Sequence, residues 1–498
     1  MDINKLVDSL FCNQCVSIDI LKGNIQCEYS YCECKANSNF ASLLDMFANL
    51  CYLVDGSNFK DFNSELNFID PREIRRHTME INQTWNNHIS EKPYSSNEYK
   101  YISSQSLYII KEDLKTQKNN NSLLLRVVFW IRTLDNYFSI LLDYIDNEII
   151  NESHFPTKRG VLLLRLKSKV ADYVFNIRKE VPHTDPNRLK LRYFLNNLHL
   201  SKKVSADNYI KHRYLDFGTS KSFKNNDIED LKIGFLSGDF TVDDYDWCIE
   251  ESSNTSKLFY FNGINNKNEY CEIITKKVKE LLESNPHFII LPELFTPVDL
   301  QEKIQQEIDD YYFRKTMKDE PVNLLMVFPG SFHSWDHNNT YIFNVSRVIN
   351  SSGELVEMIY KQNQFIIKKD ENHTGILESF KKHDGYEKIS FTNKDITIFD
   401  TSLGRIAILI CIDFIIDEIA EVLEDRLVDI IFVMAMTPKP DSGKFKRRFQ
   451  ELSEKNKAVV IIGNNGSKAV KNVINLPGIN KPYTTNSFSE VKSISEIF

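Results

Sequence analysis

The chain has 498 residues and a mass of 58.2 kDa, with 42% hydrophobic, 12% aromatic and 26% charged residues and a formal net charge of −8. This composition is typical of globular proteins and excludes a mainly disordered chain. At about 150 residues per domain, the length favours two domains or more. No apolar run approaches the roughly 18 residues of a membrane-spanning helix, and the N-terminus lacks the pattern of a secretory signal. We therefore expect a cytoplasmic protein without a membrane segment.

Five cysteines gather near the start of the chain, at Cys12, Cys15, Cys27, Cys32 and Cys34. Four such thiolates can hold a tetrahedral zinc ion. The last two have Cys-x-Cys spacing, however, and no histidine lies nearby. The total of nine cysteines is odd, which disfavours a disulfide framework. We expect reduced thiols and no metal or cofactor, with zinc as the alternative.

Residues 1–217 are predicted to form a mostly helical domain, because apolar residues recur every three or four positions from about residue 40. The clearest predicted helices cover 103–116, 122–147 and 160–180. A basic block over 155–224 holds 16 Lys or Arg against 5 Asp or Glu, a local charge of +11. Such a block can bind an anionic partner, nucleic acid included, or form a solvated surface.

A further helix is predicted over 188–200, RLKLRYFLNNLHL, with an apolar stripe at helical spacing. Arg192 and His199 fall on one flank of that stripe. This pattern resembles the Arg-x6-His motif of HEPN-type helical domains, many of which are ribonucleases. The resemblance implies a second candidate site at Arg192 and His199, whereas the alternative is an amphipathic helix with a solvated Arg and a hydrogen-bonded His.

A polar segment at 218–230 is predicted to be a linker, and the texture changes after it. Residues 231–498 alternate short β-branched runs with helical stretches near 268–284, 415–425 and 443–457, which predicts an α/β domain. The expected strands cover 232–237, 287–293, 323–332, 340–350, 354–361, 396–400, 405–413, 429–435 and 458–465. Ser351, Ser352 and Gly353 supply a hairpin turn between two of them.

Three polar residues stand directly after apolar strands. Glu293 follows FIILP, Lys361 follows ELVEMIY, and Cys411 follows RIAILI. A thiolate can act as a nucleophile, a carboxylate as its general base, and an ammonium group as a stabiliser of developing negative charge. Each residue alone has an ordinary structural explanation, but the three together form a plausible catalytic set.

The residues around this set resemble the nitrilase superfamily, the carbon-nitrogen hydrolases, which use Glu, Lys and Cys in that chain order. Four segments are similar to its motifs, in order: LPELFTP at 291–297, GRIAILICIDFIIDE at 404–418, DIIFVMAMTP at 429–438 and KAVVIIGNNGS at 457–467. The second contains the nucleophile, with acids at Asp413 and Glu418. The resemblance spans about 231–480, roughly half of the chain.

The resemblance implies a four-layer α-β-β-α sandwich, no cofactor, and a homodimer or larger homo-oligomer. It implies Glu293 as general base, Cys411 as nucleophile, and Lys361 with the backbone amide of Ile412 as the oxyanion site. Family members carry a second Glu between the Lys and the Cys. Glu371 is the nearest candidate here, with Glu378 as the alternative, although neither the spacing nor the Gln362-Asn363 pair after the Lys follows the common pattern.

The predicted function is that of a thiol hydrolase that cleaves a non-peptide carbon-nitrogen bond of a small molecule, with an N-terminal domain that regulates access or binds a partner. An amide is the expected substrate. Nitriles, carbamoyl amides and acyl transfer to another acceptor stay open. The alternative is a ribonuclease or defence effector in which the nitrilase-like domain is a small-molecule sensor or scaffold.

Overall fold

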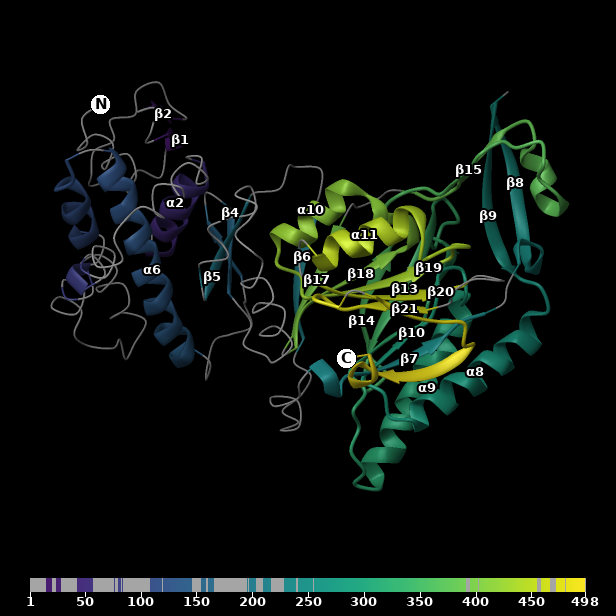
Figure 1. The fold of residues 1–498 in the computed structure, drawn as a ribbon. Coiled ribbons are helices and arrows are strands. Elements are labelled where there is room, and N and C mark those ends of the chain that lie inside the picture. Colours follow the sequence, from purple (N-terminus) through teal and green to yellow (C-terminus); the bar gives the residue numbers. More distant parts are fainter. Residues whose placement is uncertain are drawn as a thin grey trace. The chain divides into compact units, whose positions relative to one another are not determined.

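A computed structural model of the chain divides into two compact units. The first comprises Met1–Arg165 and Lys179–Val204, and the second comprises Leu166–Arg178 and Ser205–Phe498 (Figure 1). The described residues of the second unit are 209–215 and 228–497, without 239–240, 254, 391–394, 402, 455–457, 466–471 and 480. The described residues before them are 15–19, 24–27, 43–56, 76, 79–81, 83, 108–118, 120–145, 154–157, 160–164, 195 and 197–202.

The N-terminal unit contains helices, as predicted, but also strands that the sequence did not predict. Its elements are β1 (Cys15–Asp19), β2 (Asn24–Cys27), α2 (Leu43–Gly56), α6 (Asn120–Ile145), β3 (His154–Thr157), β4 (Gly160–Leu164) and β5 (Leu198–Lys202). A helix also covers 108–115. The predictions at 103–116 and 122–147 are therefore confirmed as helices within their described residues.

Two helix predictions in this unit are wrong where the structure describes them. The segment predicted as a helix over 160–180 begins as β4, and the one predicted over 188–200 ends in β5. The reason is tertiary pairing: β4 and β5 are antiparallel neighbours, and the backbone N–H of Leu198 donates to Asp135 on α6 at 2.8 Å. These non-local bonds override the local helical pattern.

The C-terminal unit has two large sheets among its described residues. The spatial order of the first is β12 (Ser331–Trp335), β13 (Ile342–Asn350), β11 (Met326–Phe328), β10 (Phe288–Ile290), β7 (Lys232–Leu236) and β23 (Ser489–Ser493), with β14 (Leu355–Tyr360) also paired to β13. That of the second is β22 (Tyr483–Thr485), β21 (Asn472–Asn475), β20 (Val459–Asn464), β19 (Ile430–Ala435), β18 (Gly404–Ile410), β17 (Asp395–Thr401) and β6 (Tyr209–Leu215). Every strand segment predicted for this domain contains a strand.

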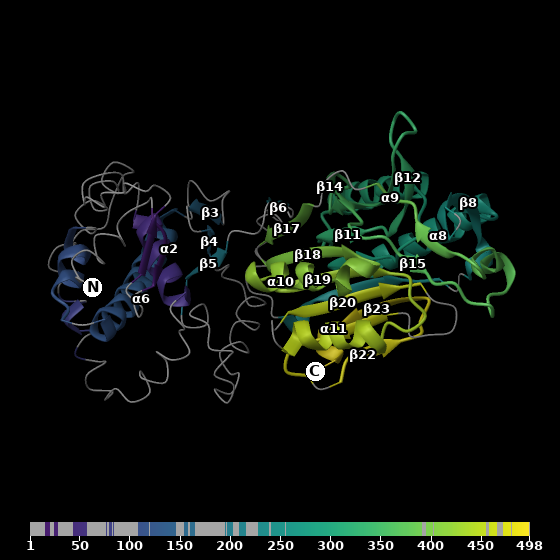
Figure 2. The ribbon, with the colours of Figure 1, turned by 90° about the horizontal axis from the view of Figure 1, so that it is seen from above.

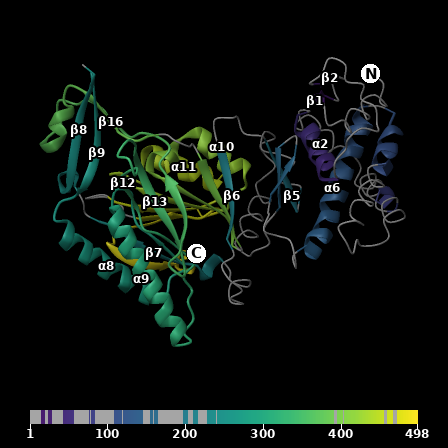
Figure 3. The same cartoon turned by 180° about the vertical axis from the view of Figure 1, so that it is seen from behind.

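The two sheets pack face to face and helices cover their outer faces, so the predicted four-layer α-β-β-α sandwich is confirmed. Figure 2 shows α10 (Asp417–Asp425) and α11 (Gly443–Glu454) over the second sheet. Figure 3 shows α8 (Lys267–Glu283) and α9 (Val298–Met317) side by side on the opposite face. The sequence had predicted α8, α10 and α11 but not α9.

Aromatic and aliphatic side chains fill the space between the sheets. The ring of Phe432 on β19 lies 4.9 Å from that of Phe288 and 4.6 Å from that of Phe328 on the facing sheet. Gly463 on β20 also packs against that sheet, since a Cβ there would lie 3.1 Å from Ile290. Strands buried on both faces read as continuous apolar runs, which is why the sequence predicted them well.

A third, smaller sheet of the C-terminal unit was not predicted. Its order is β15 (Ile366–Ile367), β16 (Asp384–Glu387), β9 (Ser256–Ile264) and β8 (Tyr245–Ser253), and Figure 1 shows β8 and β9 extending from the sandwich. The strand β6 likewise enters the second large sheet from before the predicted linker at 218–230, by pairing with β17. Among the described residues, no helix is both long and apolar enough to cross a membrane.

Candidate active site

Glu293, Lys361 and Cys411 meet at one edge of the sandwich, although 118 positions of the chain separate the first from the last. Each side chain follows the end of a strand, β10, β14 and β18 respectively. The Nζ atom of Lys361 lies 2.7 Å from Oε1 of Glu293, and the Cys411 thiol is close enough to Glu293 for the carboxylate to raise its pKa. All three are buried, with at most 5% of their surface exposed. The structure thus brings together the three residues that the sequence singled out.

Backbone geometry orients two of these residues. Cys411 itself has φ of 49°, and Leu294, which follows Glu293, has φ of 53°. Residues other than glycine rarely adopt this left-handed conformation, and where they do the strain often belongs to a functional site. The strained turn at Cys411 ends β18 and starts a 3₁₀ turn, Cys411–Ile415.

The loop that carries Glu293 is held tightly by its neighbours. Gly330, with φ of 86°, lies so close that a Cβ there would sit 2.5 Å from the carbonyl oxygen of Pro292. The hydroxyl of Thr296 donates to the carbonyl oxygen of Pro329, and the backbone N–H of Ser331 donates to that of Pro292 at 3.2 Å. These contacts fix the backbone of the loop from which the Glu293 side chain projects.

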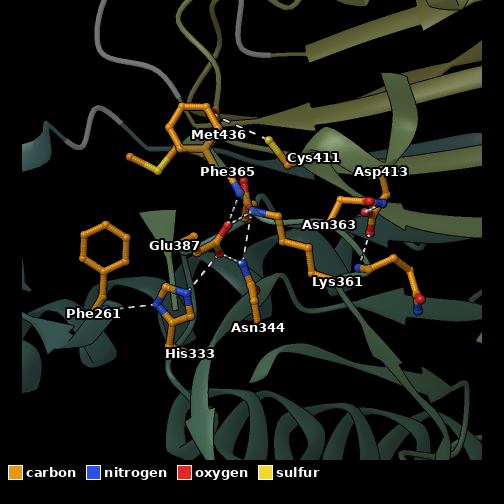
Figure 4. A network of polar contacts seen from close by, with 12 residues as sticks. Phe261, His333, Asn344, Lys361, Asn363, Phe365, Glu387, Cys411, Asp413 and Met436 are labelled. Carbon is orange, nitrogen blue, oxygen red and sulfur yellow. Dashed lines mark hydrogen bonds and ion pairs between the residues drawn. The ribbon is translucent and has the colours of Figure 1, made fainter. Parts of the chain in front are cut away.

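The second carboxylate at Lys361 is Glu387, so the expectation of Glu371 or Glu378 for this role is wrong. Both of those side chains lie outside the site, Glu371 exposed and Glu378 paired with Lys381 on the surface. Glu387 sits at the end of β16 and accepts four hydrogen bonds: from Lys361 Nζ (2.5 Å), Phe365 N (2.9 Å), Asn344 Nδ2 (3.0 Å) and His333 (3.0 Å) (Figure 4). No local pattern indicated Glu387, because the small sheet that carries it was not predicted.

Asn344 on β13 links the two carboxylates. Its Nδ2 donates to Oε1 of Glu293 and to Oε1 of Glu387, each at 3.0 Å. Its backbone carbonyl accepts from the N–H of Lys361 at 2.9 Å. Because carboxylates only accept hydrogen bonds, the amide nitrogen must face them. One side chain therefore fixes the spacing of the whole charged set.

The charges of the set determine its protonation. Burial disfavours the ammonium form of Lys361, but Glu293 and Glu387 outweigh burial and raise its pKa above the usual value. Burial would raise the pKa of Glu387, but Lys361 and the hydrogen bond from His333 hold it well below the usual range. Burial, followed by the charge of Glu293, raises the pKa of the Cys411 thiol well above the usual value. The charge of Lys361 lowers this pKa but does not outweigh the other two effects. The resting site thus holds a neutral thiol that needs a base to become a nucleophile.

Asp413 connects the nucleophile turn to the segment that follows Lys361. It accepts a hydrogen bond from the backbone N–H of Gln362 at 2.8 Å and one from Nδ2 of Asn363 at 2.8 Å (Figure 4). The side chain is buried, and burial raises its pKa to about 7 despite these donors. The acid two positions after the cysteine therefore joins the segment of Cys411 to the segment that follows Lys361.

We expect Asp413→Asn to change how stability depends on pH. Because the pKa of Asp413 is raised from 3.8 to about 7 on folding, this group stabilises the fold below about pH 4, and that contribution is lost as the pH rises to 7. The free energy of unfolding of the wild type, minus that of Asp413→Asn, should fall by a few kcal/mol over this range, since one pKa unit is worth about 1.4 kcal/mol. Urea denaturation at several pH values measures it, and a pH-independent difference would contradict the assignment.

Met436 contacts the cysteine and is in turn contacted by Tyr245. The carbonyl oxygen of Met436, just after β19, lies 4.0 Å from Sγ of Cys411. Tyr245 at the start of β8 reaches the sulfur of the same Met436 at 3.8 Å and accepts a hydrogen bond from Asn465 at 3.0 Å. Met436 and Asn465 lie in the motif segments 429–438 and 457–467, where the sequence indicates no role for them, and Tyr245 lies in none of these segments.

The remaining predicted site residues are Ile412 and those of the N-terminal unit. Ile412 is half-buried in the 3₁₀ turn beside Cys411. His199 is buried in β5 rather than on a helix, and Arg192 lies outside the described residues. In the cysteine-rich segment, Cys15 and Cys27 are backbone partners of β1 and β2, while Cys12, Cys32 and Cys34 are not described. Within the described part of the chain, no cluster of three or more His, Cys, Asp or Glu side chains could hold a metal ion.

Comparison with known proteins gives a family for the C-terminal part. Residues 264–444 match the family described as carbon-nitrogen hydrolase. No curated protein sequence matches the chain.

The solved structures that the chain matches share little sequence with it. An amidase from Nesterenkonia sp. is 10% identical over 53% of this chain and 88% of its own, with a TM-score of 0.33. A double mutant of the amidase from Nesterenkonia sp. AN1, in complex with acrylamide, is 9% identical over 53% and 89%, with a TM-score of 0.36. Nit3 of Saccharomyces cerevisiae, a member of branch 10 of the nitrilase superfamily, is 13% identical over 54% and 92%, with a TM-score of 0.36.

Proposed function

We propose that the C-terminal unit, of which residues 264–444 match the carbon-nitrogen hydrolase family, cleaves the amide bond of a small molecule through a covalent acyl-enzyme on Cys411. One observation carries this proposal. At the strand ends, a buried thiol lies near a buried carboxylate that raises the thiol pKa, and an ammonium group is hydrogen-bonded to that same carboxylate. These are the groups that acyl transfer to and from a cysteine sulfur requires.

The first half of the reaction forms the acyl-enzyme. Glu293 takes the proton of the Cys411 thiol, and the thiolate attacks the carbonyl carbon of the amide. The oxyanion that forms is stabilised by Lys361 and the backbone N–H of Ile412. When the tetrahedral intermediate collapses, the carbon-nitrogen bond breaks and Glu293 returns its proton to the departing amine.

The second half releases the product. Glu293, again a carboxylate, takes a proton from a water molecule that attacks the thioester carbon. Collapse of this second intermediate breaks the carbon-sulfur bond, and the proton passes back to the cysteine sulfur. The products are a carboxylic acid and an amine. Lys361 keeps its proton throughout, in keeping with its raised pKa between two carboxylates.

Intact-protein mass spectrometry tests the proposal. The protein is incubated with a panel of small amides, nitriles and N-carbamoyl compounds, and the wild type is compared with Cys411→Ala and with Cys248→Ala, a half-buried cysteine on β8. We expect a mass increase of one acyl group in the wild type and in Cys248→Ala but not in Cys411→Ala. An adduct in Cys411→Ala would contradict the proposal, and so would no adduct across the panel with a Cys411 thiol unreactive to iodoacetamide.

The N-terminal unit is proposed to regulate this activity or to bind a partner. Its support is the basic block at 155–224, with a local charge of +11, of which residues 155–165 and 179–204 belong to this unit; such a block suits an anionic partner. A homodimer or larger homo-oligomer, and a cytoplasmic location, also stay predictions from the sequence.

A further inference from the structure

A fully buried histidine that the reaction does not use stands behind Glu387. His333 on β12 accepts a hydrogen bond at Nδ1 from the backbone N–H of Phe261 on β9, at 3.0 Å. Its Nε2 lies 3.0 Å from Oε1 of Glu387. The imidazole stacks on the Phe261 ring, with 5.4 Å between ring centroids and 22° between planes. Figure 4 shows the histidine between these two partners.

These partners determine the charge and tautomer of the imidazole. Because Nδ1 accepts the N–H of Phe261, it carries a lone pair and no proton. The proton of the neutral ring is therefore on Nε2, which donates to Glu387. His333 is thus a fixed neutral donor rather than a second cation beside the carboxylate.

His333 and Asn344 act on the same atom from neighbouring strands. The two residues are direct partners in the antiparallel register of β12 and β13, and both donate to Oε1 of Glu387 at 3.0 Å. The other oxygen, Oε2, is thereby left for Lys361 at 2.5 Å and for the backbone N–H of Phe365. With Oε1 held on one side, the carboxylate has one favourable orientation, in which Oε2 faces the ammonium group.

The histidine also joins two sheets. His333 belongs to the first large sheet, whereas Phe261 and Glu387 come from β9 and β16 of the small sheet, which pair with each other in parallel. The small sheet is therefore fixed to the catalytic edge at the point where it delivers Glu387.

We propose that His333 is a positioning residue, which holds Glu387 against Lys361 by donating a hydrogen bond from its neutral imidazole. The proposal rests on the proposed function in so far as Lys361 acts in catalysis. A neutral donor suits this role, because it orients the carboxylate without adding a positive charge that would compete with Lys361 for it. Loss of the donor lets Glu387 rotate, and Lys361 then leaves the position in which it meets the oxyanion.

Three substitutions separate the functions of the ring. His333→Phe keeps the ring that stacks on Phe261 and removes both nitrogens. His333→Asn places an acceptor near the Nδ1 position but does not reach Glu387. His333→Gln places an amide N–H near the Nε2 position and restores the donor. If the role of His333 is merely structural, the variant that keeps the ring, His333→Phe, should retain activity. If the proposed role is right, the variant that keeps the donor, His333→Gln, should retain it.

We expect His333→Gln to keep kcat within about threefold of the wild type, and His333→Phe and His333→Asn to lose about 10- to 100-fold, as is typical when the outer partner of a functional ligand is removed. KM should change by no more than about threefold in all three, because substrate binding is not involved. Activities are normalised to titrated Cys411, so that misfolded protein does not count. Wild-type kcat in His333→Phe, or equal losses in Phe and Gln, would overturn the proposal.

Crystal structures of the same variants provide a test that needs no substrate. The hydrogen bond between Lys361 and Glu387 should persist in His333→Gln and be lost in His333→Phe. If the wild type turned over no compound, the proposed function would fail, and these structures would still decide the role of His333. An unchanged Glu387 carboxylate in His333→Phe would contradict it.

Discussion

Replacing Glu293 with Gln is expected to lower kcat by about 10⁴-fold, the upper end of the range for a general acid-base group. The reason is that Glu293 acts in both halves of the proposed reaction, lies near the thiol and is hydrogen-bonded to Lys361. Gln keeps the shape but cannot take the thiol proton, whose pKa is raised well above the usual value. The measurement is steady-state turnover of whichever amide gives an acyl adduct.

The matched control is Glu371→Gln, which neutralises the exposed carboxylate that the sequence favoured as the second Glu. It should leave kcat and KM unchanged. Near-normal turnover by Glu293→Gln would rule out Glu293 as the base, and a large loss in Glu371→Gln would return that residue to the site.

Replacing Lys361 with Met is expected to damage both catalysis and stability. It removes the cation between two buried carboxylates, each at 2.7 Å or less, and breaking a buried ion pair in this way costs about 3–5 kcal/mol. It also removes one donor to the oxyanion, which is worth about 10²- to 10³-fold in kcat. Urea denaturation and turnover measure the two effects, and Lys368→Met, which removes an exposed lysine paired with Asp384, is the control.

A double variant distinguishes the two effects. In Lys361→Met with Glu387→Gln, one of the two uncompensated charges is gone, so part of the lost stability should return. Turnover should not return, because the oxyanion donor is still missing. If activity recovered together with stability, Lys361 would have a structural role only.

The catalytic strands were predictable because burial on both faces leaves a clear local signal. β18, β19 and β20 are buried along their whole length, and such strands read as uninterrupted apolar runs. A polar residue at the end of such a run stands out, which is how Glu293 and Cys411 were found. The pairing of these strand ends in space followed from the resemblance to a known family and not from the runs themselves.

Glu387 was not predictable in the same way. It lies 26 positions after Lys361, at the end of a four-residue strand with no apolar pattern, DGYE. Its role depends on the pairing of β16 with β9, a partner about 130 positions earlier in the chain. Glu371 was closer in sequence, but it lies in an exposed turn.

Non-local strand pairing also explains why the helix predicted over 188–200 in the N-terminal unit is wrong. The segment around His199 has apolar residues at helical spacing, yet its end is a strand held by β4 and by Asp135. The spacing of apolar residues along a short segment indicates which of them are buried, but both a helix and a strand can bury such a set.

The sequence by itself was enough to predict the strands of the sandwich, the family resemblance and the three residues Glu293, Lys361 and Cys411. The reason is that each of these features depends on a contiguous segment of the chain. Only the tertiary structure decided which carboxylate completes the set, that Asn344 and His333 hold it, and that Asp413 ties the nucleophile turn to Lys361. The physical reason is that hydrogen bonds between buried polar groups depend on distance in space. Residues that carry no pattern along the chain become partners when sheets pack their ends together.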